Sequence, residues 1–169
     1  MKTAFGLEGN VLLNIFDSQS GKLLHTQEQH NLVVSGGLGA MLRVMNEPYG
    51  ARTVFDSVRF NDTTAGAPAW GDTTVEAGYL EKPITAVDTL FGPTPADGVS
   101  DKSHFELLAA EYNGNNINEL SLWVRTIYLE VGVPDEVILF SRVKIAPIAK
   151  TSSIRIEGTW EIKCSVVVV

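Results

Sequence analysis

The sequence predicts a mainly β protein, an antiparallel, jelly-roll-like β-sandwich in which residues 1–169 form a single domain. Three observations predict this class. Short β-branched and aromatic segments recur along the chain, clusters of Gly, Pro, Asn and Asp separate them, and only one segment has helical spacing. The length of 169 residues suits one ordinary domain, and 44% hydrophobic with 20% charged residues is typical of a folded protein.

The first two predicted strands form a hairpin. Residues 10–16 are rich in apolar and β-branched side chains and end in a polar turn at Gly21, where a positive φ is accessible to glycine. Residues 22–29 return from that turn and carry mostly polar side chains. The sequence therefore predicts that the second strand is exposed or lies at a sheet edge.

One short helix is predicted near residues 36–46. Apolar residues occur there at positions i, i+3, i+4 and i+7, Ser35 is a suitable N-cap, and Pro48 and Gly50 follow the segment. The neighbouring glycines Gly36 and Gly37 are not followed by a phosphate-binding motif. We therefore expect them to permit close packing of the helix against a strand.

The rest of the chain predicts further strands around one long polar loop, residues 61–77. Loops of that length are often functional or form interfaces. With the first two, the remaining segments make seven or eight strands, at residues 54–60, 84–91, 104–112, 117–130, 136–145 and 153–169.

Charge and cysteine content exclude several classes of protein. Twenty acidic and 13 basic residues give a net charge of −7, without a Lys/Arg stripe, which argues against nucleic acids and anionic membranes as partners. A single cysteine, Cys164, precludes an internal disulfide and is expected as a small buried hydrophobe. No signal-peptide pattern or membrane-length apolar run is present, so a soluble protein is expected.

No motif predicts catalysis, so we expect a protein that is not an enzyme and that uses no cofactor or metal. The histidines lack metal-site spacing, and no nucleophile elbow occurs. A hydrolase with an unrecognised carboxylate pair remains an alternative, with Glu106, Glu111 and Glu119 as candidates.

Aromatic residues and the chain ends supply the candidate contact sites. Trp70 lies in the long loop, where an exposed indole suits either an interface or sugar stacking, whereas Trp123 and Trp160 are predicted to lie in the core. Residues 164–169 form an uncharged terminal strand, which is either a central strand or covered by a neighbouring subunit. Residues 1–7 are either an arm that reaches a neighbour or a frayed end. The candidate interface residues are Phe5, Trp70, Asp72, Tyr79, Val166, Val167, Val168 and Val169.

The order of several segments resembles small virion proteins of tailed bacteriophages, including tail-fibre-like, collar and decoration proteins. The matching segments are HNLVV before a glycine-containing helix, AP and DT in the long loop, and a strand at residues 118–123, followed by LFSRVKIAPIAK and then WEI. The resemblance covers roughly residues 8–163 and rests on the shared order of these segments. The chain departs from the pattern at residues 61–63, where the family has GTG, and at residues 119–123, where it has EVGLF.

The resemblance implies a virion structural protein in the tail, neck, baseplate or fibre attachment region, or on the capsid as a decoration. Its partners would be further copies of the chain, as a trimer or larger homo-oligomer, and other virion proteins. It would be made in the bacterial host cytoplasm and reside in the virion. The alternative function is a carbohydrate-binding module that recognises host surface glycans through Trp70 and Tyr79.

Overall fold

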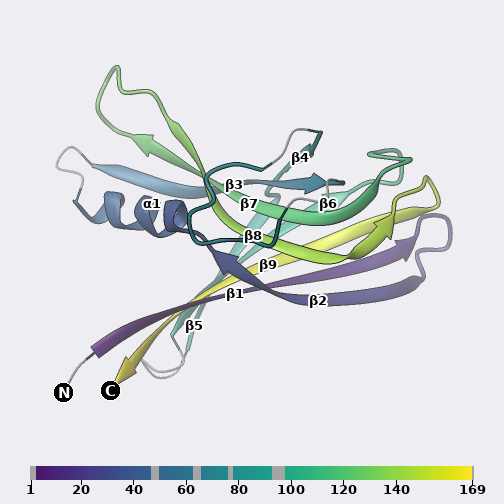
Figure 1. The fold of residues 1–169 in the computed structure, drawn as a ribbon, viewed down its shortest axis with the longest axis horizontal. Coiled ribbons are helices and arrows are strands. Elements are labelled where there is room, and N and C mark those ends of the chain that lie inside the picture. Colours follow the sequence, from purple (N-terminus) through teal and green to yellow (C-terminus); the bar gives the residue numbers. More distant parts are fainter. Residues whose placement is uncertain (1–2, 47–49, 63–65, 76–77, 93–97, 169) are drawn as a thin grey trace.

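The computed structural model of the chain describes residues 3–46, 50–62, 66–75, 78–92 and 98–168 (Figure 1). One helix, α1 (Ser35–Asn46), accompanies the strands. The strands are β1 (Thr3–Asp17), β2 (Leu23–Val33), β3 (Ala51–Asn61), β4 (Leu80–Pro83), β5 (Ala86–Phe91), β6 (Val99–Leu107), β7 (Asn116–Tyr128), β8 (Glu136–Ala149) and β9 (Ile154–Val168).

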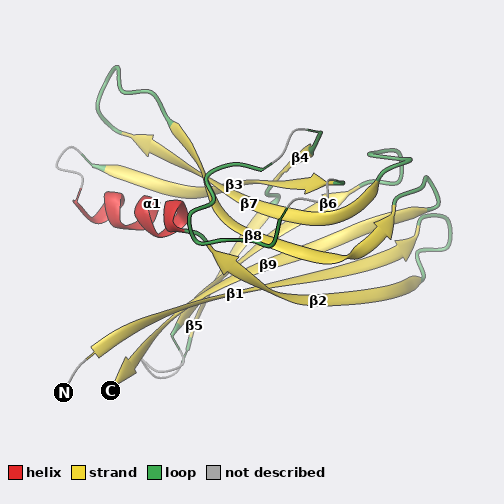
Figure 2. Cartoon of the chain, viewed as in Figure 1, coloured by secondary structure: helices red, strands yellow, loops and turns green. Residues whose placement is uncertain are grey.

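All strand pairs are antiparallel, and the strands follow the order β4-β3-β7-β8-β2-β1-β9-β6-β5 in one curled sheet (Figure 2). The predicted mainly β, antiparallel class with one short helix is confirmed. A jelly-roll-like sandwich of two sheets is not confirmed, because the sheet is continuous and forms a half-barrel. Continuity comes from β2, which pairs with β1 up to Asn31 and then with β8 through Leu32 and Val33.

The two ends of the sheet approach each other where the chain passes from β4 to β5. Ile84 donates a backbone hydrogen bond to Asp56 at 3.1 Å, and Thr85 donates one to His104 at 2.8 Å. Residues 84–91 were predicted as one strand, but Ile84 still bonds to β3, and residues from Thr85 onward bond to or pair with β6. Beyond this crossing the two halves of the half-barrel diverge and leave one end open, which we name the mouth (Figure 1).

The hydrophobic core lies between the two halves. Trp160 of β9 is 0% exposed in this core, and Trp123 of β7 is buried in a second, smaller cluster with Val34 and Leu139, so the predicted buried positions of both are confirmed. Edge-to-face ring contacts join Phe60 to Phe105 and Phe55 to Phe140, with ring centroids 5.7 and 5.5 Å apart. The Phe60–Phe105 contact joins β3 to β6 across the two halves and supports the curl of the sheet, whereas the Phe55–Phe140 contact lies within one half, between β3 and β8.

Helix α1 packs against β8 through its glycines. A Cβ atom at Gly37 would lie 2.5 Å from the carbonyl oxygen of Phe140, and one at Gly36 would lie 3.1 Å from that of Leu139. Both positions therefore need glycine for close approach of the helix to the strand backbone. The predicted helix and its tight packing are confirmed.

The C-terminal strand is central along most of its length, which is one of the two alternatives that the sequence predicted. β9 pairs with β1 from Ile154 to Val168 and with β6 up to Cys164. The N-terminal residues from Thr3 onward belong to β1. Of the candidate interface residues, Val169 lies outside the described residues, and only the backbone is described for Phe5, Val166, Val167 and Val168.

Candidate interaction site at the open end of the half-barrel

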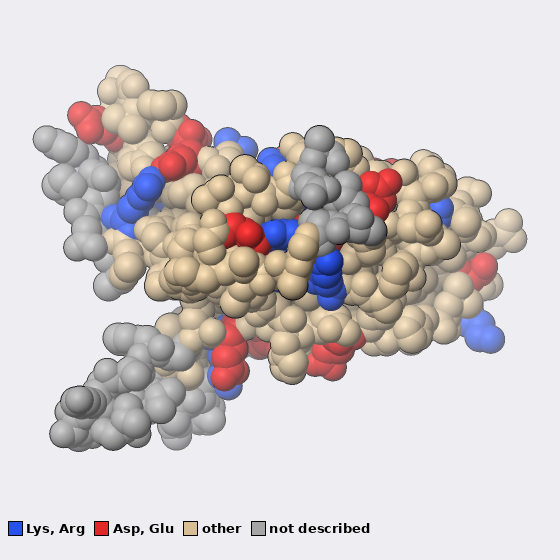
Figure 3. Space-filling view, in the orientation of Figure 1, with Lys and Arg blue, Asp and Glu red and all other residues tan. Residues whose placement is uncertain are grey.

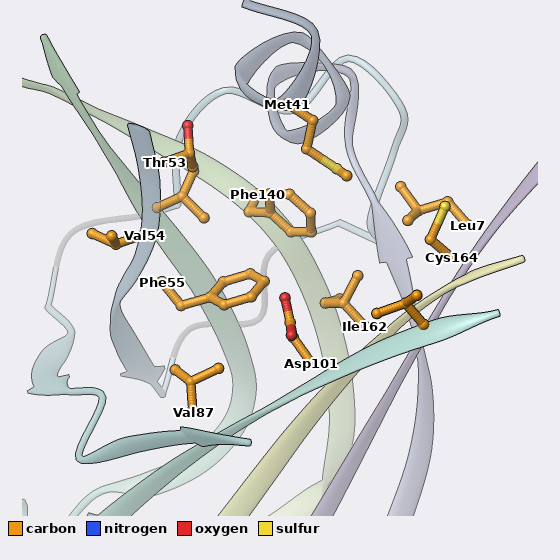
Figure 4. A pocket seen from close by; sticks show the side chains of 12 residues that line it. Leu7, Met41, Thr53, Val54, Phe55, Val87, Asp101, Phe140, Ile162 and Cys164 are labelled. Carbon is orange, nitrogen blue, oxygen red and sulfur yellow. The ribbon is translucent and has the colours of Figure 1, made fainter. Parts of the chain in front are cut away.

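An apolar groove of about 480 Å³ opens at the mouth, between the two halves of the sheet (Figure 4). Phe55 and Phe140 line one side and Ile162 lines the other, with Val87 of β5 below Phe55 and Met41 of α1 above. Asp101 is the one charged residue among the described residues that line the groove. The site therefore suits an apolar occupant.

The groove exists because two edge strands diverge without a strand between them. β4 has only four residues and pairs with β3 at residues 57–60, so no described strand pairs with the outer edge of residues 51–55. On the other side, β5 pairs with β6 alone, and its side chains are all exposed. Backbone groups on such edges are available to an added strand.

Large apolar side chains surround the mouth at the tips of two hairpins. Val131, in the β7–β8 turn, is fully exposed at 100%, Leu129 beside it is also exposed, and Phe91 at the end of β5 is 78% exposed. Sequence analysis missed these residues. The available signal was the apolar content of residues 129–133, because a turn with Gly132 and Pro134 ordinarily carries polar side chains.

The chain termini lie at the same end of the molecule as the mouth (Figure 1). Pairing of β1 with β2 starts at Gly9, and pairing of β9 with β6 ends at Cys164. Residues 3–6 and 165–168 therefore pair only with each other among the described strands, and we name this segment the terminal ribbon. Leu7 and Cys164, at its base, line the groove. Cys164 is half-buried rather than fully buried as predicted, because the groove exposes it.

Trp70 occupies the tip of a tight turn on the outer face of β7 and β8. Asp72 donates its backbone N–H to the carbonyl of Ala69 at 3.1 Å, and its carboxylate accepts the Ala69 N–H at 2.8 Å. The Trp70 carbonyl accepts the backbone N–H of Ser35 at 2.8 Å, which attaches the turn to the start of α1. The indole remains 56% exposed on a fixed turn.

A buried ion-pair cluster lies beneath this turn. Arg142 donates to both carboxylate oxygens of Glu119, with Nε–Oε1 at 3.2 Å and Nη2–Oε2 at 2.6 Å, and its Nη1 lies 2.5 Å from Asp72. Burial lowers the pKa of Arg142, but hydrogen bonds and charge from Glu119 and Asp72 outweigh burial and raise it overall. Asp72 is therefore committed to holding the turn that presents Trp70.

Tyr79 is partly exposed, and one of its faces is covered. The guanidinium of Arg59 lies between the rings of Tyr79 and Trp123, 4.4 and 3.8 Å from their centroids, and its Nε lies 2.5 Å from Glu81. This cation–π stack uses a face of Tyr79 that a sugar ring would otherwise contact. Trp70 is the more exposed of the two aromatic candidates.

The three candidate catalytic carboxylates are each paired with a different cation. Glu119 pairs with Arg142, Glu111 with Lys82 at 2.5 Å, and Glu106 approaches Arg155 at 3.9 Å. Within the described ranges, no group of three His, Cys, Asp or Glu residues is placed to hold a metal ion. The described part of the chain also contains no helix that is long and apolar enough to cross a membrane.

The visible surface carries scattered charges of both signs, and it is hollowed between the two halves at the mouth (Figure 3). This distribution agrees with the absence of a Lys/Arg stripe in the sequence. No protein-family model, curated protein or solved structure matches the chain. The geometry of the mouth and of the Trp70 turn is therefore the basis for assigning a function.

Proposed function

We propose that the chain is a non-catalytic structural subunit of a bacteriophage particle, which packs against copies of itself and against other virion proteins. The observation that carries the proposal is the apolar mouth. Its groove, its exposed hairpin tips and the terminal ribbon all lie at one end of the molecule. Soluble monomers rarely expose contiguous apolar surface of this kind unless it contacts a partner.

The sequence resemblance gives this contact surface its biological setting. Tailed-phage virion proteins assemble as symmetric rings or decorations, in which many copies of a modest contact add up to a stable particle. A subunit of such a particle needs apolar surface that is covered on assembly. The mouth offers that surface without any catalytic group beside it among the described residues that line it.

The proposal also gives a reason for the half-barrel. Its two halves face each other across one core, as the sheets of a jelly-roll-like sandwich do, and they separate only at the mouth. We regard the fold as such a sandwich with one end left open, and assembly supplies the surface that completes it. The contact between subunits would then cover the apolar core at the mouth, as a further strand of the same chain would in a closed sandwich.

Two measurements test the proposal. Peptides of this chain are expected in purified particles of the phage that encodes it, and the purified chain is expected to be an oligomer by size-exclusion chromatography with light scattering. A version that lacks residues 164–169 should associate less, because it loses strand β9 at the terminal ribbon. A monomeric full-length protein that is also absent from particles would contradict the proposal.

The exposed Trp70 favours glycan recognition as a second candidate function. A rigid turn with an exposed indole is a suitable platform for stacking against a sugar ring. Trp70→Ala should abolish binding to host surface glycans while leaving the oligomer intact. Self-association without any glycan binding by the wild type would remove this candidate.

A further inference from the structure

The mouth contains two complementary features, an apolar groove and a ribbon that pairs with no further strand among the described residues. We propose that the groove of one copy receives the terminal ribbon of a second copy, and that the contact is reciprocal. This inference rests on the proposed self-assembly and names the surface that performs it.

Unpaired backbone groups on both partners support strand addition. The outer edge of β3 has no described strand beside residues 51–55, since the Asp56 carbonyl already accepts the Ile84 N–H. The terminal ribbon has no described strand on either side, and only Gly98 lies against its base at Cys164 and Ser165. An extended segment placed along the β3 edge would pair these donors and acceptors, as in β-strand addition. Edges left exposed in this way are otherwise a liability for aggregation.

The chemistry of the ribbon matches that of the groove. Residues 3–6 and 165–168 read TAFG and SVVV and contain no charged side chain. The groove is lined by Phe55, Phe140 and other apolar side chains, with Asp101 as its one charged residue among the described lining. A charged segment would lose the hydration of its charges there, whereas the ribbon has no charged side chain to desolvate.

The position of the two features makes the contact two-fold. Leu7 and Cys164 line the groove and also form the base of the ribbon, so each copy presents both features at one end. Two copies that meet end to end can therefore each insert a ribbon into the groove of the other. The same contact then forms twice and closes, which makes a pair the unit of any larger assembly.

Single charges at the two surfaces test the inference in the full-length protein. Val54→Lys places a cation on the half-exposed groove rim, and Val166→Glu and Val167→Glu introduce an anion at two successive positions of the ribbon. Val54→Lys and at least one of the glutamate variants should weaken self-association at least about tenfold, measured by light scattering and sedimentation. Leu24→Glu, on exposed β2, is the matched control and should leave the mass at the wild-type value.

Mixing a groove variant with a ribbon variant provides the decisive experiment. Equimolar Val54→Lys and the disrupting glutamate variant should restore a dimer, because the lysine groove meets the glutamate ribbon and the second contact is unaltered. Restoration also shows that both variants are folded. Wild-type oligomers that tolerate all three substitutions would overturn the groove–ribbon contact and leave the proposed function intact. A wild type that stays monomeric at high concentration would overturn both.

Discussion

Replacing Glu119 with glutamine should destabilise the protein strongly although the side-chain volume hardly changes. Glu119 is 0% exposed and holds Arg142 through two charge-assisted hydrogen bonds. Each such bond contributes about 1.5–3 kcal/mol, and breaking a buried pair from one side costs about 3–5 kcal/mol. Asp72 still partners Arg142 in the variant, so we expect the lower end, about 3 kcal/mol.

The measurement is urea unfolding followed by tryptophan fluorescence, at two protein concentrations so that subunit dissociation is distinguished from unfolding. A loss of about 3 kcal/mol corresponds to a melting temperature lower by roughly 6–12 °C for a chain of this size. Asp72→Asn is the comparison variant. Its carboxylate is 22% exposed, so it should cost only about 1–2 kcal/mol.

A cost below about 1 kcal/mol for Glu119→Gln would refute the reasoning, because it would mean that water screens the Arg142–Glu119 pair as it screens surface pairs. The double variant Glu119→Leu with Arg142→Met gives a second check. Removing both charges should recover most of the loss. A double variant as unstable as Glu119→Gln would show that shape, and not an unpaired charge, sets the cost.

Three further predictions concern the helix, the exposed turn and a buried lysine. Gly37→Ala should destabilise the protein by about 1–3 kcal/mol in thermal unfolding, because its Cβ would press on Phe140, whereas Gly39→Ala, with open space around it, should stabilise the helix by up to about 1 kcal/mol. Equal effects would contradict this packing. Trp70→Ala should change the free energy of unfolding by no more than about 0.5 kcal/mol, since the indole is exposed, and a large loss of stability would contradict this exposed position. Burial lowers the pKa of Lys150 below its ordinary value of 10.5, so at alkaline pH the unfolded chain binds more protons at this residue than the folded chain, and the free energy of unfolding should rise as pH approaches 10.5. Lys150→Arg stays protonated and should lose that rise. A variant with the wild-type dependence of stability on pH would contradict this prediction.

Much of the strand pattern could be predicted because local signals and long-range pairing agree there. The helix begins at Ser35, within one residue of its predicted start, since the apolar spacing that predicts it acts locally. β1 is longer than predicted at its N-terminus, because Gly6 and Glu8 do not favour strands but pair with Ser165 and Lys163 of β9. Partners distant in sequence override local preference at such positions.

The site was less accessible to sequence reasoning. Trp70 was found because a tryptophan in a polar loop is unusual, and it is exposed. The groove was missed because it is a gap between β3 and β5, and no single segment encodes a gap. The outer edge of residues 51–55 lacks a strand because β4 is short, and the charged residues Glu81 and Lys82 of β4 gave no clear strand signal.

The pairing of the first described strand with the last governs when the protein can finish folding. Thr3 lies opposite Val168, so the β1–β9 seam cannot close until residues 154–168 have been synthesised. Contacts between such distant segments form slowly, because the intervening chain must be ordered first. Closure of this seam, the terminal ribbon included, therefore waits for the last described strand, whereas the pairing of β7 with β8 needs no residue beyond Ala149.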